Sequence, residues 1–212
     1  MKLLYKELAL AAHPTFFVFT LLGCLVLVPA YPYTVVFLFG CLAPYITLLY
    51  ARETNDAWYT AVLPVTKRDV VRAKCRLVAC AQLAQLLLSV PFALLRGCLG
   101  IPNNPVGLDA TAAWYGFGLI LYALFDLVFF PAYYKTGYQA GKSFLLAMLP
   151  VLPCMLCIEF LGHVPALAWL DRSTMQDLPA QLPFLFAGAL FYGFALTLAC
   201  RTAERRFERV DL

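Results

Sequence analysis

Residues 15–50 read TFFVFTLLGCLVLVPAYPYTVVFLFGCLAPYITLLY, and no side chain in this stretch is charged. It divides into two apolar runs, Thr15–Tyr31 and Tyr33–Tyr50, and the segment Pro29–Tyr33 that joins them is too short for anything but a tight hairpin. A bilayer core about 30 Å thick needs roughly 20 apolar residues per helix. The stretch therefore predicts two antiparallel membrane-spanning helices, with tyrosines at the membrane interface between them.

Four further charge-poor runs of similar length follow this stretch: Leu77–Leu95, Ala113–Tyr133, Phe144–Gly162 and Gln181–Cys200. The whole chain of 212 residues is 63% hydrophobic and 13% charged, with a mean hydropathy of +0.78. A soluble domain is about 45–50% apolar and about 25% charged, so lipid must cover the surplus. The composition predicts an all-α integral membrane protein with six transmembrane helices in a single domain, 1–212. It excludes a secreted disulfide scaffold, a disordered chain and an ordinary cytosolic enzyme.

The basic residues are divided unequally between the two sides of the predicted membrane domain. If the N-terminus is cytosolic, 14 of the 16 Lys and Arg residues fall in inner segments, and only Arg96 and Arg172 fall outside. Such an excess follows the positive-inside rule, so we expect both termini in the cytosol. The net charge of +4 then has a topological explanation, and we expect no nucleic-acid partner.

The N-terminal segment, residues 1–14, has its basic and apolar side chains on different sides of a helix. One side carries Lys2, Lys6 and His13, and the other carries Leu4, Leu8 and Ala11. Pro14 separates this segment from the first span. The pattern predicts an amphipathic helix that lies in the membrane interface, rather than a frayed tail.

The longest segment expected in the cytosol is 51–76, ARETNDAWYTAVLPVTKRDVVRAKCR. Thr54, Asn55 and Asp56 can cap a short helix that carries aromatic residues and ends at Pro64. Thr66, with Asp69 three residues later, can begin a second helix that runs into the third span. This helix–proline–helix segment is either a docking surface for a cytosolic partner or a basic anchor at the lipid headgroups.

Asp126 and Glu159 are the two acidic residues inside the predicted spans. A charge at the bilayer centre costs about 2.5–3.5 kcal/mol on insertion scales, so such residues usually face a protein interior or a water-filled path. Each of the two therefore either lines a pathway through the membrane or forms a polar packing contact between helices.

The sequence lacks a recognisable catalytic or cofactor site. Residues 137–143, GYQAGKS, resemble a phosphate-binding loop, but three residues separate the glycines where the motif needs four, and no strand precedes them. The two histidines, His13 and His163, fall on opposite sides of the membrane, so we expect no metal site. Cys154 and Cys157 lie among apolar neighbours, where a reactive thiolate is disfavoured. We therefore expect a non-enzyme that binds no cofactor itself.

Two stretches carry a resemblance to a known family. The stretch Arg52–Asp56 with the later LPVTKRDVVRAK, residues 63–74, resembles the loop after the second span in permease subunits of type-two ATP-binding cassette (ABC) exporters. The opening MKLLYKEL with His13 and Pro14 is similar to the amphipathic elbow of that family. The likeness is to small bacterial permeases that export amphipathic peptides together with a separate ATPase subunit. The connection before the last span lacks the long extracellular loop of larger members.

The resemblance implies a division of labour between subunits in a bacterial cytoplasmic membrane. This chain, with a second permease copy or paralogue, would translocate an amphipathic peptide or similar hydrophobic substrate across the lipid bilayer, while two ABC ATPase subunits bind ATP and Mg. By position, the coupling-helix residues would be Arg52, Glu53, Asp56, Trp58 and Tyr59, and the next helix would begin with Lys67, Arg68 and Asp69. Independently of the resemblance, the pathway interpretation of the two acids inside the predicted spans places Asp126 and Glu159 along the transport pathway.

Three alternatives from other classes stay open at this point. The first is the substrate-binding membrane subunit of a vitamin importer, which also has about six spans and depends on partner ATPases. The second is a catalytic membrane protein, and the third is an immunity or sensing protein that only binds peptides. The scarcity of outward polar clusters counts against the first, and the scattered acids count against the second.

Overall fold

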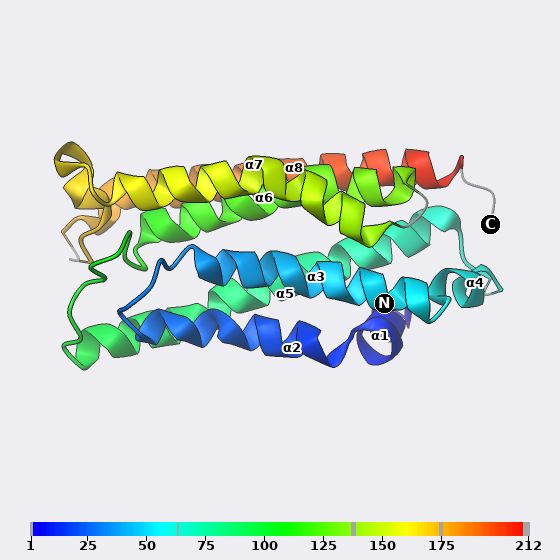
Figure 1. The fold of residues 1–212 in the computed structure, drawn as a ribbon, viewed down its shortest axis with the longest axis horizontal. Coiled ribbons are helices and arrows are strands. Elements are labelled where there is room, and N and C mark those ends of the chain that lie inside the picture. The colour runs from blue at the N-terminus through cyan, green and yellow to red at the C-terminus, as the bar shows by residue number, and fades with distance from the viewer. Residues whose placement is uncertain (1, 63, 137–138, 174–175, 210–212) are drawn as a thin grey trace.

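The computed structural model describes residues 2–62, 64–136, 139–173 and 176–209, and every regular element in these ranges is helical (Figure 1). The turns η2 and η3 are 3₁₀-helices, and η1 is a π-helical turn. The elements are α1 (Lys2–Lys6), η1 (Glu7–Ala11), α2 (Pro14–Leu21), η2 (Leu22–Leu27), α3 (Val35–Glu53), α4 (Asp56–Ala61), α5 (Lys67–Cys98), α6 (Ala112–Lys135), α7 (Ala140–Leu161), η3 (Pro165–Leu170) and α8 (Leu178–Phe207).

The all-α membrane fold is confirmed, because five helices are long and apolar enough to cross a bilayer: α3, α5, α6, α7 and α8. The first predicted span is shorter than expected. It consists of α2 and η2, ends at Leu27, and counts as a sixth span only together with the preceding helix, from which it is bent by 87°. The expected continuation to Tyr31 is wrong, because Val28 precedes Pro29 and takes the extended backbone that a proline imposes on its neighbour.

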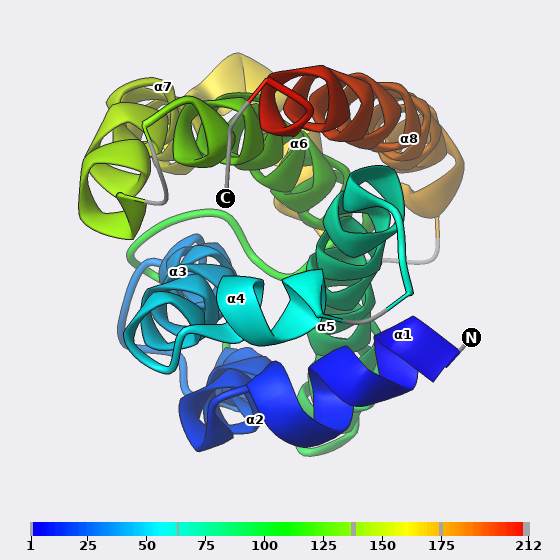
Figure 2. The ribbon, with the colours of Figure 1, turned by 90° about the vertical axis from the view of Figure 1, so that its right-hand side faces the viewer.

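The spanning helices form two groups that lie side by side (Figures 1 and 2). In one group α6 packs between α7 and α8, and its contact with α8 is the most extensive between any two elements. In the other group α2 and η2 pack against α3 and α5. Helix α5 also contacts α8, so it joins the two groups.

A close crossing of backbones holds α6 against α8. A Cβ atom added to Gly188 would overlap the main chain of Gly116, and one added to Gly116 would overlap the carbonyl of Phe184. Further along the same face of α8, three alanines are fully buried: Ala195, Ala199 and Ala203. In lipid, helices associate through such packing of small residues rather than through the hydrophobic effect.

The segments predicted to carry most of the basic residues lie at one end of the bundle. The short helices α1 and α4, the start of α5 and the end of α8 lie at one end of the bundle, which we call the basic end (Figure 1). The loop over residues 99–111 and the segment 162–173, which contains η3, lie at the opposite end. Viewed from the basic end, α1 and α4 run across the ends of the spanning helices (Figure 2).

The two helices that begin in the 51–76 segment, α4 and α5, are capped differently at their N-termini. As expected, Thr66 caps α5: its Oγ1 accepts from the Asp69 amide at 3.2 Å and donates to the Asp69 carboxylate at 2.6 Å. The expected side-chain cap of α4 is wrong. Asn55 takes a left-handed conformation with φ 53° and its side chain makes no capping hydrogen bond, because the chain must turn sharply within two residues.

Candidate functional site

Helix α4 presents an apolar surface at the basic end. The side chains of Tyr59 and Val62 lie three positions apart and are 56% and 72% exposed. Arg52 and Glu53, at the end of α3, are also exposed beside this helix. The side chain of Trp58, predicted to share this surface, lies outside the described part of the chain. Exposed apolar groups with a polar rim are typical of a protein-interaction surface.

The predicted residues at the start of α5 contact the end of α8 instead. The Nε of Arg68 lies 2.5 Å from a carboxylate oxygen of Glu208. The ammonium of Lys67 lies 5.7 Å from the ring centroid of Phe207. Asp69 belongs to the helix cap described above. Lys67 and Arg68 therefore hold the start of α5 against the end of α8, whereas Asp69 stabilises the start of α5 itself.

Asp56, another predicted coupling residue, faces inward. Its carboxylate accepts from Lys6 at 2.5 Å and from Lys74 at 2.8 Å. Burial alone would raise the pKa of Asp56, but the two ammonium groups outweigh this effect and hold the pKa of the carboxyl below its usual value. Asp56 is thus an ionised, internally paired residue rather than part of the exposed face of α4.

Asp126 lies fully buried in the middle of α6 and belongs to a polar cluster. The Gln82 amide donates to one carboxylate oxygen of Asp126 at 3.1 Å, and the Tyr192 hydroxyl donates to the Gln82 carbonyl at 2.7 Å. The second carboxylate oxygen of Asp126 has no hydrogen-bond partner among the described atoms. The cluster joins α5, α6 and α8 at one point within the membrane domain.

The polar cluster continues along α5 beyond Gln82. Gln85 accepts from the Tyr122 hydroxyl at 2.6 Å and donates to the carbonyl of Val36 at 2.9 Å. Ser89 lies 3.0 Å from the hydroxyl of Tyr115. Sequence reasoning missed these residues. Polar residues at positions i, i+3 and i+7 of an apolar run give one polar helix face, and that spacing was the available signal.

Glu159, the second predicted pathway residue, lies at the opposite end of the bundle. Its carboxylate accepts from the amide and hydroxyl of Thr34 at 2.9 and 2.6 Å, and from the Leu108 amide at 3.2 Å. The side chain therefore joins α7 to the start of α3 and to the 99–111 loop. No described hydrogen bond or ion pair links it to Asp126, so the structure does not bring the two acids together.

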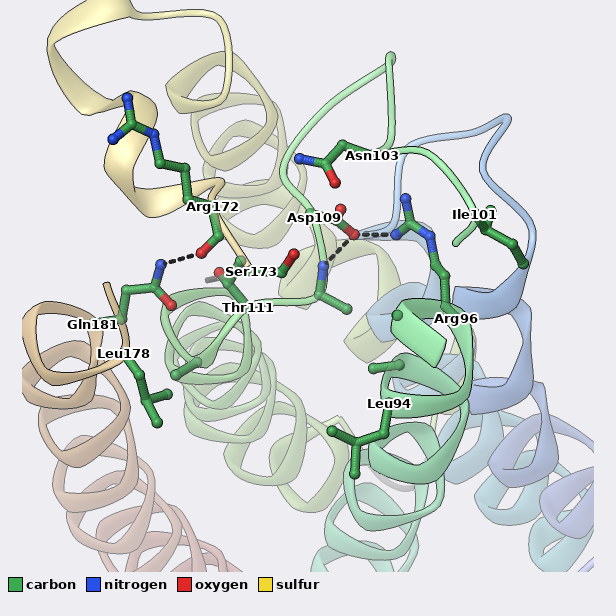
Figure 3. Close-up of a pocket in the computed structure, with 14 residues that line it drawn as sticks. Leu94, Arg96, Ile101, Asn103, Asp109, Thr111, Arg172, Ser173, Leu178 and Gln181 are labelled. Carbon is green, nitrogen blue, oxygen red and sulfur yellow. Dashed lines mark hydrogen bonds and ion pairs between the residues drawn. The ribbon is translucent and has the colours of Figure 1, made fainter. Parts of the chain in front are cut away.

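A cavity of about 300 Å³ lies at the same end, between α5, α6 and α8 (Figure 3). On one wall, Arg96 pairs with Asp109. On the other, the Gln181 amide donates to the carbonyl of Arg172 at 2.9 Å, while the Arg172 guanidinium points away from the cavity (Figure 3). Arg96 and Asp109 thus neutralise each other, and most of the remaining lining is apolar, including Leu94 and Leu178.

The described residues show little that could hold a metal or a nucleotide. In ranges 2–62, 64–136, 139–173 and 176–209, no group of three or more His, Cys, Asp or Glu side chains is placed to bind a metal ion. The loop-like stretch 137–143 begins with Gly137 and Tyr138, which lie outside the described residues. What the geometry does provide is a membrane bundle with a surface for a partner at one end.

These features define a helical membrane protein with an internal polar cluster and an exposed helix outside its spans. The family profile of the ABC-2 family transporter proteins matches residues 2–200 of the chain. The chain therefore belongs to the ABC-2 transporter family and is the permease subunit of an ABC transporter. No curated protein and no solved structure matches it. Membership of this family favours the permease over the vitamin-binding, catalytic and immunity alternatives.

Proposed function

We propose that this permease works as an exporter driven by separate ATPase subunits. It pairs with a second copy or a paralogue in a bacterial cytoplasmic membrane, with both termini in the cytosol. Two ABC ATPases bind ATP and Mg and dock at the basic end. The substrate is an amphipathic peptide or a similar hydrophobic molecule, which suits a chain whose polar groups inside the membrane are few and mostly paired.

The observation that carries this proposal is the exposed face of α4. Tyr59 and Val62 project from a short helix that lies outside the spans, at the end where basic residues gather. A large exposed apolar side chain outside the membrane domain gains most from burial against a second protein. The proposal assigns ATP hydrolysis to the partner subunits, so the energy for transport would reach the spans through such a contact.

Copurification from native membranes tests the proposal. We expect the unmodified chain, extracted in mild detergent, to bring down a P-loop ATPase identified by mass spectrometry. The variant Tyr59→Ser/Val62→Ser should lose this ATPase and keep its own membrane insertion, because the change removes the apolar contact without touching a span. Tyr5→Ser is the matched control, since Tyr5 is an exposed tyrosine of the basic end on a different helix.

Two outcomes would contradict the proposal. If the Tyr59→Ser/Val62→Ser variant retains the ATPase as well as Tyr5→Ser does, the docking surface lies elsewhere. If liposomes that contain only this chain accumulate a fluorescent amphipathic peptide against a gradient, transport needs no ATPase subunit. Either result can be obtained without knowing the natural substrate in advance.

A separate prediction concerns Asp126 as a pathway residue. We expect Asp126→Asn to lower export several-fold and to leave assembly unchanged. Asparagine keeps an oxygen that accepts from Gln82 but removes the ionisable carboxyl group. Export of the substrate from cells and the melting temperature of the purified complex are the two measurements. Tyr192→Phe, which removes a neighbouring hydrogen bond and leaves the carboxylate, is the control. Normal export by Asp126→Asn would leave Asp126 as a packing contact.

A further inference from the structure

Four charged side chains form a closed ring at the basic end. Glu7 is fully buried, and Lys74, Asp56 and Lys6 are only 7%, 10% and 12% exposed. Lys6 lies 3.1 Å from Glu7 and 2.5 Å from Asp56, and Lys74 lies 3.0 Å from Glu7 and 2.8 Å from Asp56. Each lysine thus contacts both carboxylates, and the ring has no net charge.

The ring joins three elements that are separate in the sequence. Lys6 and Glu7 come from the N-terminal elbow, Asp56 from α4 and Lys74 from the third turn of α5. The Lys6 ammonium also contacts the hydroxyl of Thr60, on the next turn of α4, at 2.9 Å. Lys6 and Glu7 therefore point toward the protein. Tyr5, by contrast, is exposed.

Because its charges are buried, the ring resists displacement of the elements that it joins. Taking a charge out of water is costly, and one left without its partner inside a protein destabilises it strongly. A shift of α4 by itself would break both contacts of Asp56. The connections of α4 along the chain are weaker constraints, because the left-handed Asn55 separates it from α3 and the non-helical residues 64–66 precede α5. The ring, rather than helix continuity, sets where α4 lies.

We propose that the ring of Lys6, Glu7, Asp56 and Lys74 carries movement of α4 to the elbow and to α5. These four are positioning residues, and they need no contact with the ATPase. The inference rests on the proposed docking of an ATPase at the exposed face of α4. From Lys74 the same helix continues to Gln82 and Gln85, so it connects the ring to the polar cluster around Asp126.

Two double variants cut the ring in different places and leave it neutral. Asp56→Asn/Lys74→Met removes the pair between α4 and α5, and leaves Lys6 beside Glu7. Lys6→Met/Glu7→Gln removes the contribution of the elbow, and leaves Lys74 paired with Asp56. The control is Arg72→Met/Glu204→Gln, which removes an ion pair between α5 and α8 at the same end and leaves all four members of the ring in place.

The measurement is hydrogen exchange of the complex with its ATPase, with and without a nonhydrolysable ATP analogue and Mg. In the unmodified complex and in the control, we expect the nucleotide to change exchange in α4, in the elbow and in the first turns of α5. Asp56→Asn/Lys74→Met should lose the change in α5 and keep the change in α4. Lys6→Met/Glu7→Gln should lose the change in the elbow and keep the change in α5.

The outcomes separate this inference from the proposed function. If the unmodified chain binds no ATPase, the proposed function fails. If the ATPase binds and both double variants respond to nucleotide as the unmodified complex does, only the ring inference is overturned. Failure of both double variants to fold would also overturn it, since the ring would then be an anchor for folding alone. Loss of response in the two different elements supports it.

Discussion

Gly188→Leu is expected to prevent most of the chain from reaching its folded state. The added side chain would start at a Cβ that overlaps the main chain of Gly116, and a backbone cannot rotate away as a flexible side chain can. Overpacking that side chains can relieve by shifting costs about 1–3 kcal/mol. An overlap with main chain cannot be relieved in this way, so we expect a loss of at least about 5 kcal/mol, comparable with the whole stability of about 5–15 kcal/mol. The α6–α8 contact is also the most extensive in the molecule, so its loss separates helices that nothing else holds as closely.

The chain contains a matched control on the same helix. A Cβ added to Gly193 meets no other heavy atom within 4 Å, so Gly193→Leu should fold as the unmodified chain does. Size-exclusion profiles in detergent and the melting temperature of the monodisperse fraction measure both variants. A Gly188→Leu protein as stable as Gly193→Leu would mean that α6 and α8 do not cross where the structure places them.

Arg96→Met is expected to have the second largest effect, a loss of about 3–5 kcal/mol of stability. The guanidinium is buried between the Asp109 carboxylate and the carbonyl of Pro102, and it stacks over the ring of Tyr33 at 5.3 Å. Without it, the Asp109 carboxylate stays buried and has lost its charged partner. For a chain of this size we expect the melting temperature to fall by on the order of 10 °C.

Two further variants test whether the unpaired Asp109 carboxylate causes the loss of stability in Arg96→Met. Arg96→Met/Asp109→Asn should recover part of the lost stability, because the buried carboxylate is gone. Arg172→Met, which alters the other basic residue of this end, should change the melting temperature little, since Arg172 is exposed. Equal melting temperatures for Arg96→Met and Arg172→Met would show that the buried pair contributes nothing measurable.

Local patterns in the sequence predicted much of the fold. Five of the six apolar runs became spanning helices because a continuous apolar run can satisfy its backbone in lipid only as a helix. The cap at Thr66 was predictable, since its partner Asp69 lies one turn away. The end of the first span was not placed correctly. There, hydropathy continued to Tyr31 while the extended backbone before Pro29 ended the helix at Leu27.

Contacts between distant residues explain what the sequence could not predict about the site. A helical wheel places Lys6 on the polar face of the elbow, so the sequence alone predicts that its ammonium group contacts water. The structure gives it Asp56 instead, 50 residues away. Glu159 likewise contacts Thr34 across 125 residues. The roles of Tyr59 and Asp126 as coupling and pathway residues stay predictions that the experiments above address.

The length of α5 has a mechanical consequence. At 1.5 Å per residue, the part of this helix before Pro91 is about 36 Å long, which exceeds the thickness of the hydrocarbon core. A tilt of about 5° around its basic end would displace the other end of this rod by about 3 Å, the length of one hydrogen bond. In the proposed movement the helix would act as a lever, because a small rotation near Lys74 would become a displacement as long as a hydrogen bond around Ser89.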